Sequence, residues 1–219
     1  HTAYRRQRQM CIRDRHWNGQ VFAHFTRVDV SHLRHHADVG IEVAQGRGAL
    51  RAWADVRSGQ VVGGTADLAL ADVNTTLAAD LRPLVLPSIQ GRLGGRRFTG
   101  GFEFSTQALQ FQTDDGLTWP GGNLRLVHTD ANGKAPAQGE LRADRLDLAA
   151  LAQVASRLPL GTVAHDALRS YTPQGLVEEI QATWKGPLDA LQQYQVKGRI
   201  QGLAPVSYTH LRAHETRGN

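Results

Sequence analysis

The chain has 219 residues, a formal net charge of +5 and a pI near 9.9, and 41% of its residues are hydrophobic. It contains one Cys and one Met, which excludes a disulfide framework and cysteine-rich zinc sites. No apolar run reaches the roughly 20 residues that a membrane-spanning helix needs. The length suffices for one domain with a substantial hydrophobic core.

The two ends of the chain show no apolar periodicity and match translated adapter DNA from transposase-based sequencing libraries. Read in frame, one adapter encodes Arg5 to Asp14 and the opposite adapter encodes Val206 to Thr216. We therefore interpret residues 1–15 and 205–219 as non-native tails. We expect the protein itself to occupy residues 16–204, as an internal piece of a longer chain.

Setting these tails apart removes the basic character of the chain. They hold seven of the 25 Lys and Arg residues and two of the 20 acidic residues, which leaves 18 of each in between. They also hold the Cys and the Met. Because a neutral chain offers no excess of positive charge to phosphates, no nucleic-acid partner is expected.

Alternation of apolar and polar residues predicts strands along most of the chain. The clearest lie at 66–72, 101–113, 122–128, 138–146, 177–184 and 194–203, with an irregularity in 177–184 that indicates a bulge. Glycine-containing turns are predicted between strands at Ser58–Gly59, Gly94–Gly95, Asp115–Gly116, Pro120–Gly122 and Asn132–Gly133. The pattern predicts a mainly β fold: a curved, antiparallel, meandering sheet with one apolar and one polar face.

A few short helices are expected among these strands. Residues 145–161 carry an apolar stripe at helical spacing, with Asp147 as the N-cap and Pro159 as the terminator. Residues 163–175 predict a second helix and 28–38 a weaker third. A faint internal similarity predicts two repeat units, 16–90 and 136–204, with hairpins between them. One such unit cannot close its own sheet edges.

Residues with catalytic or metal-binding chemistry form no recognisable constellation, so neither an enzyme nor a cofactor is expected. The richest cluster comprises His32, His35 and His36 with Asp29 and Asp38. On a helix, His32 and His36 would share one face and could share a metal, but a solvated helix face is the simpler interpretation. No metal site is predicted.

Two acidic pairs also have simple structural interpretations. Asp114–Asp115 precedes a glycine and is typical of a turn. Glu178–Glu179 would point to opposite faces of a strand, so the two carboxylates could not serve one site.

Four phrases follow one another along the chain: LRAWADVRSGQVVGGTADLALADVNTTLA, IQGRLGGRR, GFEFSTQALQFQTDDGLTWP and GELRADRLDLAALAQVASRLPLG. Together they resemble the YhdP family of AsmA-like proteins, and the resemblance extends across roughly His16 to Ala204. The resemblance implies a protein anchored in the inner membrane of a Gram-negative bacterium, by an anchor outside this piece, that spans the periplasm as a repeating β-groove. It implies movement of phospholipid towards the outer membrane. The implied partners are phospholipid acyl chains, neighbouring repeats of the full-length chain, and both membranes at the chain ends.

An apolar sheet face suits that implied task, because about fifteen methylenes at roughly 0.8 kcal/mol each cost on the order of 12 kcal/mol in water. The candidates to line an open groove are the apolar residues of the alternating strands: Leu68, Leu70, Phe102, Phe104, Leu109, Phe111, Leu124 and Leu126. Two alternatives stay open. The same residues could pack a closed sandwich core, or the repeats could serve as a structural or assembly element of the envelope without lipid conduction. An enzyme or carbohydrate-binding sandwich is the third hypothesis.

Overall fold

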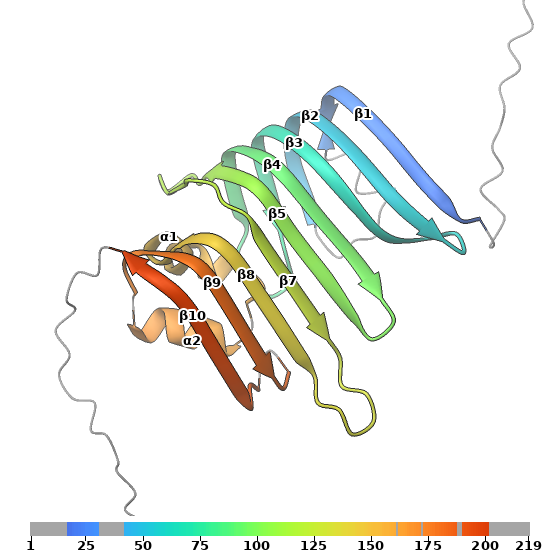
Figure 1. Ribbon diagram of the computed structural model, residues 1–219. Coiled ribbons are helices and arrows are strands. Elements are labelled where there is room, and N and C mark those ends of the chain that lie inside the picture. The colour runs from blue at the N-terminus through green and yellow to red at the C-terminus, as the bar shows by residue number, and fades with distance from the viewer. Residues whose placement is uncertain (1–16, 31–41, 161, 172, 188–189, 202–219) are drawn as a thin grey trace, which may run out of the picture.

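The computed structural model describes residues 17–30, 42–160, 162–171, 173–187 and 190–201, which form one open antiparallel sheet with two short α-helices against it (Figure 1). The mainly β, meandering fold predicted from the alternation is confirmed. The weak third helix expected at 28–38 falls mostly outside the described residues, and its first two residues end a strand. Both terminal segments interpreted as adapter-encoded also lie outside the described residues.

The sheet contains ten strands, nearly all of them paired with their neighbours in sequence. The spatial order is β1-β2-β3-β4-β5-β7-β8-β9-β10, with the two-residue β6 paired to β5. The strands are β1 (Gly19–Asp29), β2 (Glu42–Arg57), β3 (Gln60–Thr76), β4 (Leu84–Phe98), β5 (Gly101–Gln112), β6 (Thr118–Trp119), β7 (Leu124–Thr129), β8 (Gln138–Asp147), β9 (Leu176–Lys185) and β10 (Gln193–Gln201).

The turns of β2–β3, β4–β5, β7–β8 and β9–β10 lie at the same end of the strands (Figure 1). We call this end of the sheet the hairpin rim. The predicted turn at Ser58–Gly59 is confirmed, with φ of 50° and 74° at these residues. The predicted turn at Gly94–Gly95 is wrong, because both glycines lie inside β4. Gly95 pairs with Gly64 of β3 there, and an added Cβ on Gly64 would lie 2.6 Å from a neighbouring backbone oxygen. These glycines allow the neighbouring strands to approach closely. The local sequence does not distinguish such a glycine pair from one in a turn.

A series of β-bulges lies on the side of the sheet away from the hairpin rim. In β1, β3, β5 and β9, two residues lie opposite one on the neighbouring strand, and the irregularity predicted in 177–184 is among them. Asp72, Ala108 and Glu179 occupy these sites with φ between 47° and 53°. Gly91 faces the β5 bulge, where a Cβ would lie 2.7 Å from the Leu109 Cα. Because each bulge bends its strand, we call this line the crease of the sheet.

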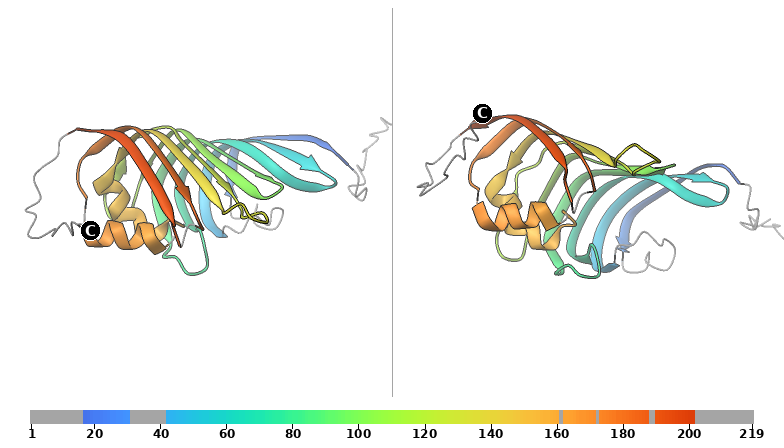
Figure 2. Two further views of the ribbon diagram at one scale, coloured as in Figure 1. Left: turned by 60° about the horizontal axis from the view of Figure 1, so that its bottom comes forward. Right: turned by 90° about the horizontal axis from the view of Figure 1, so that it is seen from below.

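The bent sheet forms an arch, and both helices lie within its concave side beneath the later strands (Figure 2). Helix α1 (Leu148–Val154) begins where β8 ends. Asp147 caps it as predicted, since its carboxylate accepts a hydrogen bond from the Ala150 N–H at 2.9 Å. A single 3₁₀ turn (Ala155–Arg157) follows, and α2 (Thr162–Tyr171) confirms the second predicted helix.

Most of the buried hydrophobic residues form three small clusters on the crease side. The first is centred on Val73, Leu84 and Leu86, and the second joins α1 to the β5–β6 turn through Leu117 and Val154. The third holds Ala143, Val177 and Ile180, with Leu146 and Leu148 packed against them. The hydrophobic core therefore stabilises the bend of the sheet. We call the part of the sheet between the crease and the hairpin rim the ledge.

Candidate functional site

The register of the strands places the apolar side chains of the ledge on one face, in rows that run across the sheet. Directly paired residues share a face, and the next row on that face lies two residues along each strand. The middle row consists of Val21, Ala54, Gly64, Gly95, Phe104, Leu126, Leu141, Ala182 and Val196.

A second apolar row, the inner row, lies two residues nearer the crease. It consists of Ala23, Ala52, Ala66, Leu93, Thr106, Leu124, Ala143 and Ile180. Neither row contains a charged residue. The helices and the third core cluster, which contains Ala143 and Ile180, identify this face as the concave one.

The exposure of these rows falls from the hairpin rim towards the crease. In the inner row Thr106, Ala143 and Ile180 are at most 8% exposed. In the middle row Phe104 is 39% exposed and Val196 is 64% exposed. The inner row is thus buried over β5, β8 and β9 and partly exposed elsewhere, whereas no residue of the middle row is buried. With strands about 4.8 Å apart, the middle row extends for roughly 40 Å across nine strands.

The eight candidates predicted from sequence divide between this open strip and the core. Leu126 and Phe104 are direct partners in the middle row, and Phe102 lies one row nearer the rim. Leu68 faces Leu50 and Gly91, between the rows and the bend. Leu109 lies in the β5 bulge.

The other three candidates belong to packed clusters. Leu70 and Phe111 pack against the first core cluster, and Leu124 packs against the third. Phe111 also stacks on Trp119, with ring centroids 5.6 Å apart. The structure therefore brings together only part of the predicted set on the open face.

Sequence reasoning missed the contribution of small residues and of the edge strands to this face. Ala54, Ala182 and Gly95 continue the middle row between larger side chains, and Val21 and Val196 extend it to both edges. The period-two signal was present in each strand. Alanine and glycine carry little hydrophobicity, however, and only the register reveals that they align with leucine and phenylalanine on neighbouring strands.

The convex face of the sheet carries charged side chains in alternating order. Asp67 lies between two arginines, with Arg51 Nη2 at 3.4 Å and Arg92 Nη2 at 3.0 Å from its Oδ2. Glu103 accepts from Arg125 Nε at 2.6 Å and from Arg96 Nη2 at 2.7 Å. Cross-strand pairs of opposite charge stabilise adjacent strands. We interpret this charged convex face as the side of the sheet that faces solvent.

These ion pairs shift the titration of the groups involved. The hydrogen bond from Arg92 holds the pKa of the Asp67 carboxyl below its usual value. The hydrogen bond from Arg125, with that from Arg96, does the same to the pKa of Glu103. Donation to Glu103 in turn raises the pKa of Arg125. Each shift follows from stabilising the charged form of the group.

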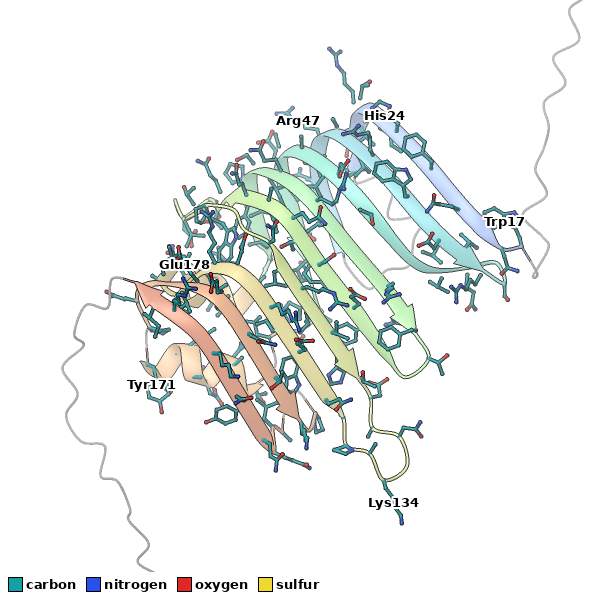
Figure 3. The ribbon with its side chains drawn as sticks, viewed as in Figure 1. Trp17, His24, Arg47, Lys134, Tyr171 and Glu178 are labelled. Carbon is teal, nitrogen blue, oxygen red and sulfur yellow. The ribbon has the colours of Figure 1, made fainter. Side chains whose placement is uncertain are left out.

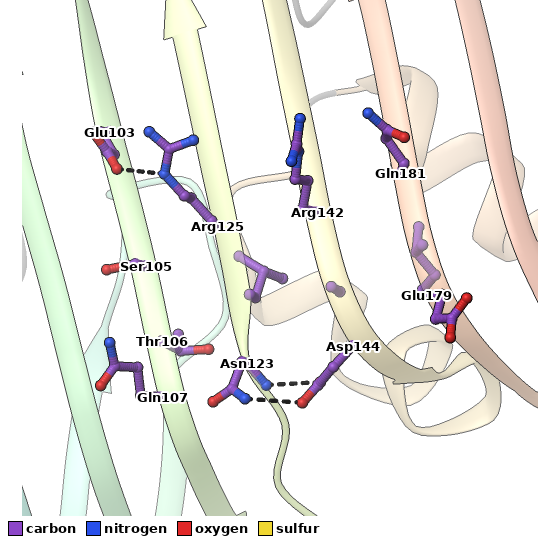
Figure 4. Close-up of a pocket in the computed structure, with 13 residues that line it drawn as sticks. Glu103, Ser105, Thr106, Gln107, Asn123, Arg125, Arg142, Asp144, Glu179 and Gln181 are labelled. Atoms are coloured by element: carbon purple, nitrogen blue, oxygen red, sulfur yellow. Dashed lines mark hydrogen bonds and ion pairs between the residues drawn. The ribbon is translucent and has the colours of Figure 1, made fainter.

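A surface depression of about 570 Å³ lies on this convex face, and Figure 4 shows that polar side chains surround it. Glu103, Arg125, Arg142 and Gln181 come from four successive strands, and Asn123 binds the Asp144 carboxylate. Most of its charged side chains are engaged in ion pairs or hydrogen bonds with neighbouring residues, such as Glu103 with Arg125.

Each acidic pair considered in the sequence contributes a residue to an ion pair, and most of the histidine cluster lies outside the described residues. Asp115 accepts from Arg157 Nη2 at 2.9 Å and lies in a turn, as predicted for the Asp114–Asp115 pair. Glu179 binds Arg199 at 2.8 Å. His32, His35, His36 and Asp38 lie outside the described residues. Within the described ranges, no group of three or more His, Cys, Asp or Glu side chains is placed to hold a metal ion.

An open, bent antiparallel sheet with one apolar and one charged face defines a groove-forming β protein. The sequence profile of the YhdP protein family matches residues 5–215. The chain therefore belongs to the YhdP family, as its resemblance predicted. The matched span includes parts of both terminal segments, and their adapter origin stays a prediction. No curated protein and no solved structure matches the chain significantly.

Helices of the described part of the chain are all too short or too polar to cross a membrane.

Proposed function

We propose that this chain is a segment of a bacterial envelope protein that conducts phospholipid along the concave apolar face of its sheet. The observation that carries the proposal is the uncovered middle row, in which large side chains such as Phe104 stay partly exposed. A soluble domain rarely leaves a continuous apolar strip of this extent uncovered unless something binds there. Family membership supports the envelope setting.

The geometry supports conduction better than storage. The middle row crosses every strand of the ordered path and ends at open edges, β1 and β10, among the described residues. An acyl chain on such a strip meets the same aliphatic surface at each strand, so it can advance without crossing a polar barrier. Additional strands at either edge would lengthen the strip, as the repeat prediction requires.

A second candidate function, a structural or assembly role without lipid, has an observation of its own. Part of the apolar surface stabilises the fold, because Leu70, Phe111 and Leu124 pack against the core clusters. The open strip would then contact another protein.

Site-specific photo-crosslinking separates these two functions. A benzophenone amino acid at Phe104 faces the strip, and the same amino acid at the adjacent Ser105 faces the convex side. After irradiation of the chain in the envelope of a Gram-negative host, mass spectrometry of the Phe104 variant is expected to find phospholipid adducts that the Ser105 variant lacks. Protein adducts alone at Phe104 would support the structural role and contradict conduction.

A further inference from the structure

The row of the concave face nearest the hairpin rim differs in chemistry from the two aliphatic rows. Successive direct partners across six strands define this rim row: Arg97, Phe102, His128, Gly139, Trp184 and Tyr194. It combines Phe102 and three ring side chains that carry a polar atom, His128, Trp184 and Tyr194, with one arginine. Such side chains suit a boundary between hydrocarbon and water, because one end is apolar and the other binds polar atoms.

Two of these side chains carry buried nitrogens without a hydrogen-bond partner among the described residues. His128 is 8% exposed and its Nδ1 is unpaired, while Nε2 lies 3.7 Å from a carboxylate oxygen of Asp130. The Trp184 Nε1–H is likewise unpaired. Native proteins seldom leave buried polar atoms unsatisfied, and an acceptor supplied by a ligand would satisfy them.

Trp184 lies flat on the sheet, because its neighbour in the row is a glycine. A Cβ on Gly139 would lie 2.1 Å from the Trp184 ring. The same arrangement occurs at the opposite edge of the sheet, where Trp17 lies (Figure 3) and where a Cβ on Gly19 would be 3.0 Å from its ring. Gly19 lies two residues from Val21 of the middle row, so both tryptophans lie on the rim side of the aliphatic strip. Because Trp184 Nε1 is buried in this position, a ligand reaches it only when the indole tilts off Gly139.

Arg97 differs from the other arginines of its strand. Arg92 and Arg96 bind carboxylates on the convex face, whereas Arg97 pairs with Phe102 on the concave face. No acidic residue shares its row. A guanidinium in that position matches an anionic oxygen, and phosphate is, with carboxylate, an anion that arginine binds in a planar, bidentate way.

We propose that the rim row binds the phosphate and ester end of a phospholipid, so that lipid lies on the sheet with its acyl chains over the middle row and pointing to the crease. This inference rests on the proposed function and adds an orientation to it. Arg97 binds the phosphate, while the Trp184 Nε1–H and, in the tautomer with its proton on Nδ1, the His128 ring donate hydrogen bonds to oxygens of the ester region. The one polar side chain in these two rows is Thr106, which is only 8% exposed and so is not available to a head group.

The four tryptophans of the chain provide the test, since each indole N–H gives one resonance in a ¹⁵N spectrum and each is assigned by its Trp→Phe variant. Trp184 and Trp17 report on the rim. Trp53 reports on the convex face, where it contacts Phe22 with ring centroids 5.2 Å apart. The probe is phosphatidylcholine below its aggregation concentration, with a nitroxide either on the head group or at the end of one acyl chain.

We expect the head-group nitroxide to broaden the Trp184 and Trp17 resonances more than the chain-end nitroxide does, and both labels to leave Trp53 unchanged. Greater broadening of Trp184 by the chain-end label would overturn the orientation and leave the proposed function intact. Equal broadening of all indoles would mean unspecific association and overturn the orientation as well. No broadening of any resonance at saturating lipid would contradict lipid binding itself, and with it the proposed function.

A matched pair of variants tests the arginine. Arg97→Gln should weaken the binding of phosphatidylglycerol about tenfold, the effect of one charge-assisted hydrogen bond, and leave diacylglycerol of the same chains unchanged. Arg96→Gln, the neighbouring position on the opposite face, should change neither affinity. Loss of affinity for both lipids in Arg97→Gln would show that Arg97 does not select the phosphate.

Discussion

The exposure of Phe104 allows a quantitative test of whether the concave strip holds a ligand. A phenylalanine side chain offers on the order of 200 Å² of surface. With 39% of Phe104 exposed, about 80 Å² remains for a bound acyl chain to cover. At about 25 cal/mol per Å² this contributes roughly 2 kcal/mol to binding. Phe104→Ala removes most of it, so the Kd for lipid should rise by at least about tenfold.

The assay is titration of the purified chain with a phospholipid that carries a pyrene-labelled acyl chain. Ser105→Ala is the matched control, since Ser105 is adjacent and lies on the convex face. Urea unfolding of the same samples reports stability, and we expect Phe104→Ala to cost less than the roughly 3–5 kcal/mol of a fully buried phenylalanine, because 39% of Phe104 is already exposed. The reasoning is refuted if Phe104→Ala leaves the Kd unchanged, or if its stability loss equals that of a buried core substitution, since Phe104 would then be a core residue.

Three further predictions concern stability. Leu86 is 2% exposed at the centre of the first core cluster. Leu86→Ala should therefore lower the free energy of unfolding by about 2–5 kcal/mol, as measured by urea denaturation. A loss below about 1 kcal/mol would mean that this cluster does not stabilise the bend. Asp147→Ala removes the N-cap of α1 and should lower the free energy of unfolding by about 0.5–2 kcal/mol. Asp147→Asn keeps a side-chain acceptor and should lower it less. Equal losses in the two variants would mean that Asp147 does not act as the cap. The carboxyls of Asp67 and Glu103 have folded-state pKa values lowered by their arginines. Their ion pairs therefore stabilise the fold fully above the unfolded-state pKa values of about 4, and that stability is lost as the pH falls through the lower folded-state values. Urea midpoints between neutral and acidic pH should decrease accordingly, and Glu103→Gln should flatten the decrease; an unchanged acid profile in that variant would contradict the assignment.

The sequence by itself determined the type of fold and the two faces of the sheet. Alternation is a local property of each strand, so Phe102, Phe104, Leu124 and Leu126 could be assigned to one face without knowing their neighbours. The cap at Asp147 was equally local. The pattern of Gly94–Gly95 was ambiguous, because glycine permits both turns and close strand approach, and only the pairing with Gly64 decided it.

The tertiary structure alone decided which part of the apolar face stays open. Leu124 and Leu126 are two residues apart with identical sequence signals, yet one packs in a cluster at the crease and the other lies on the open strip. The difference depends on the bulges and on the helix that follows β8, which bring distant segments against the inner row. The rim row likewise emerges only when six strands align. Exposure and register are sums over non-local contacts, and no window of sequence contains them.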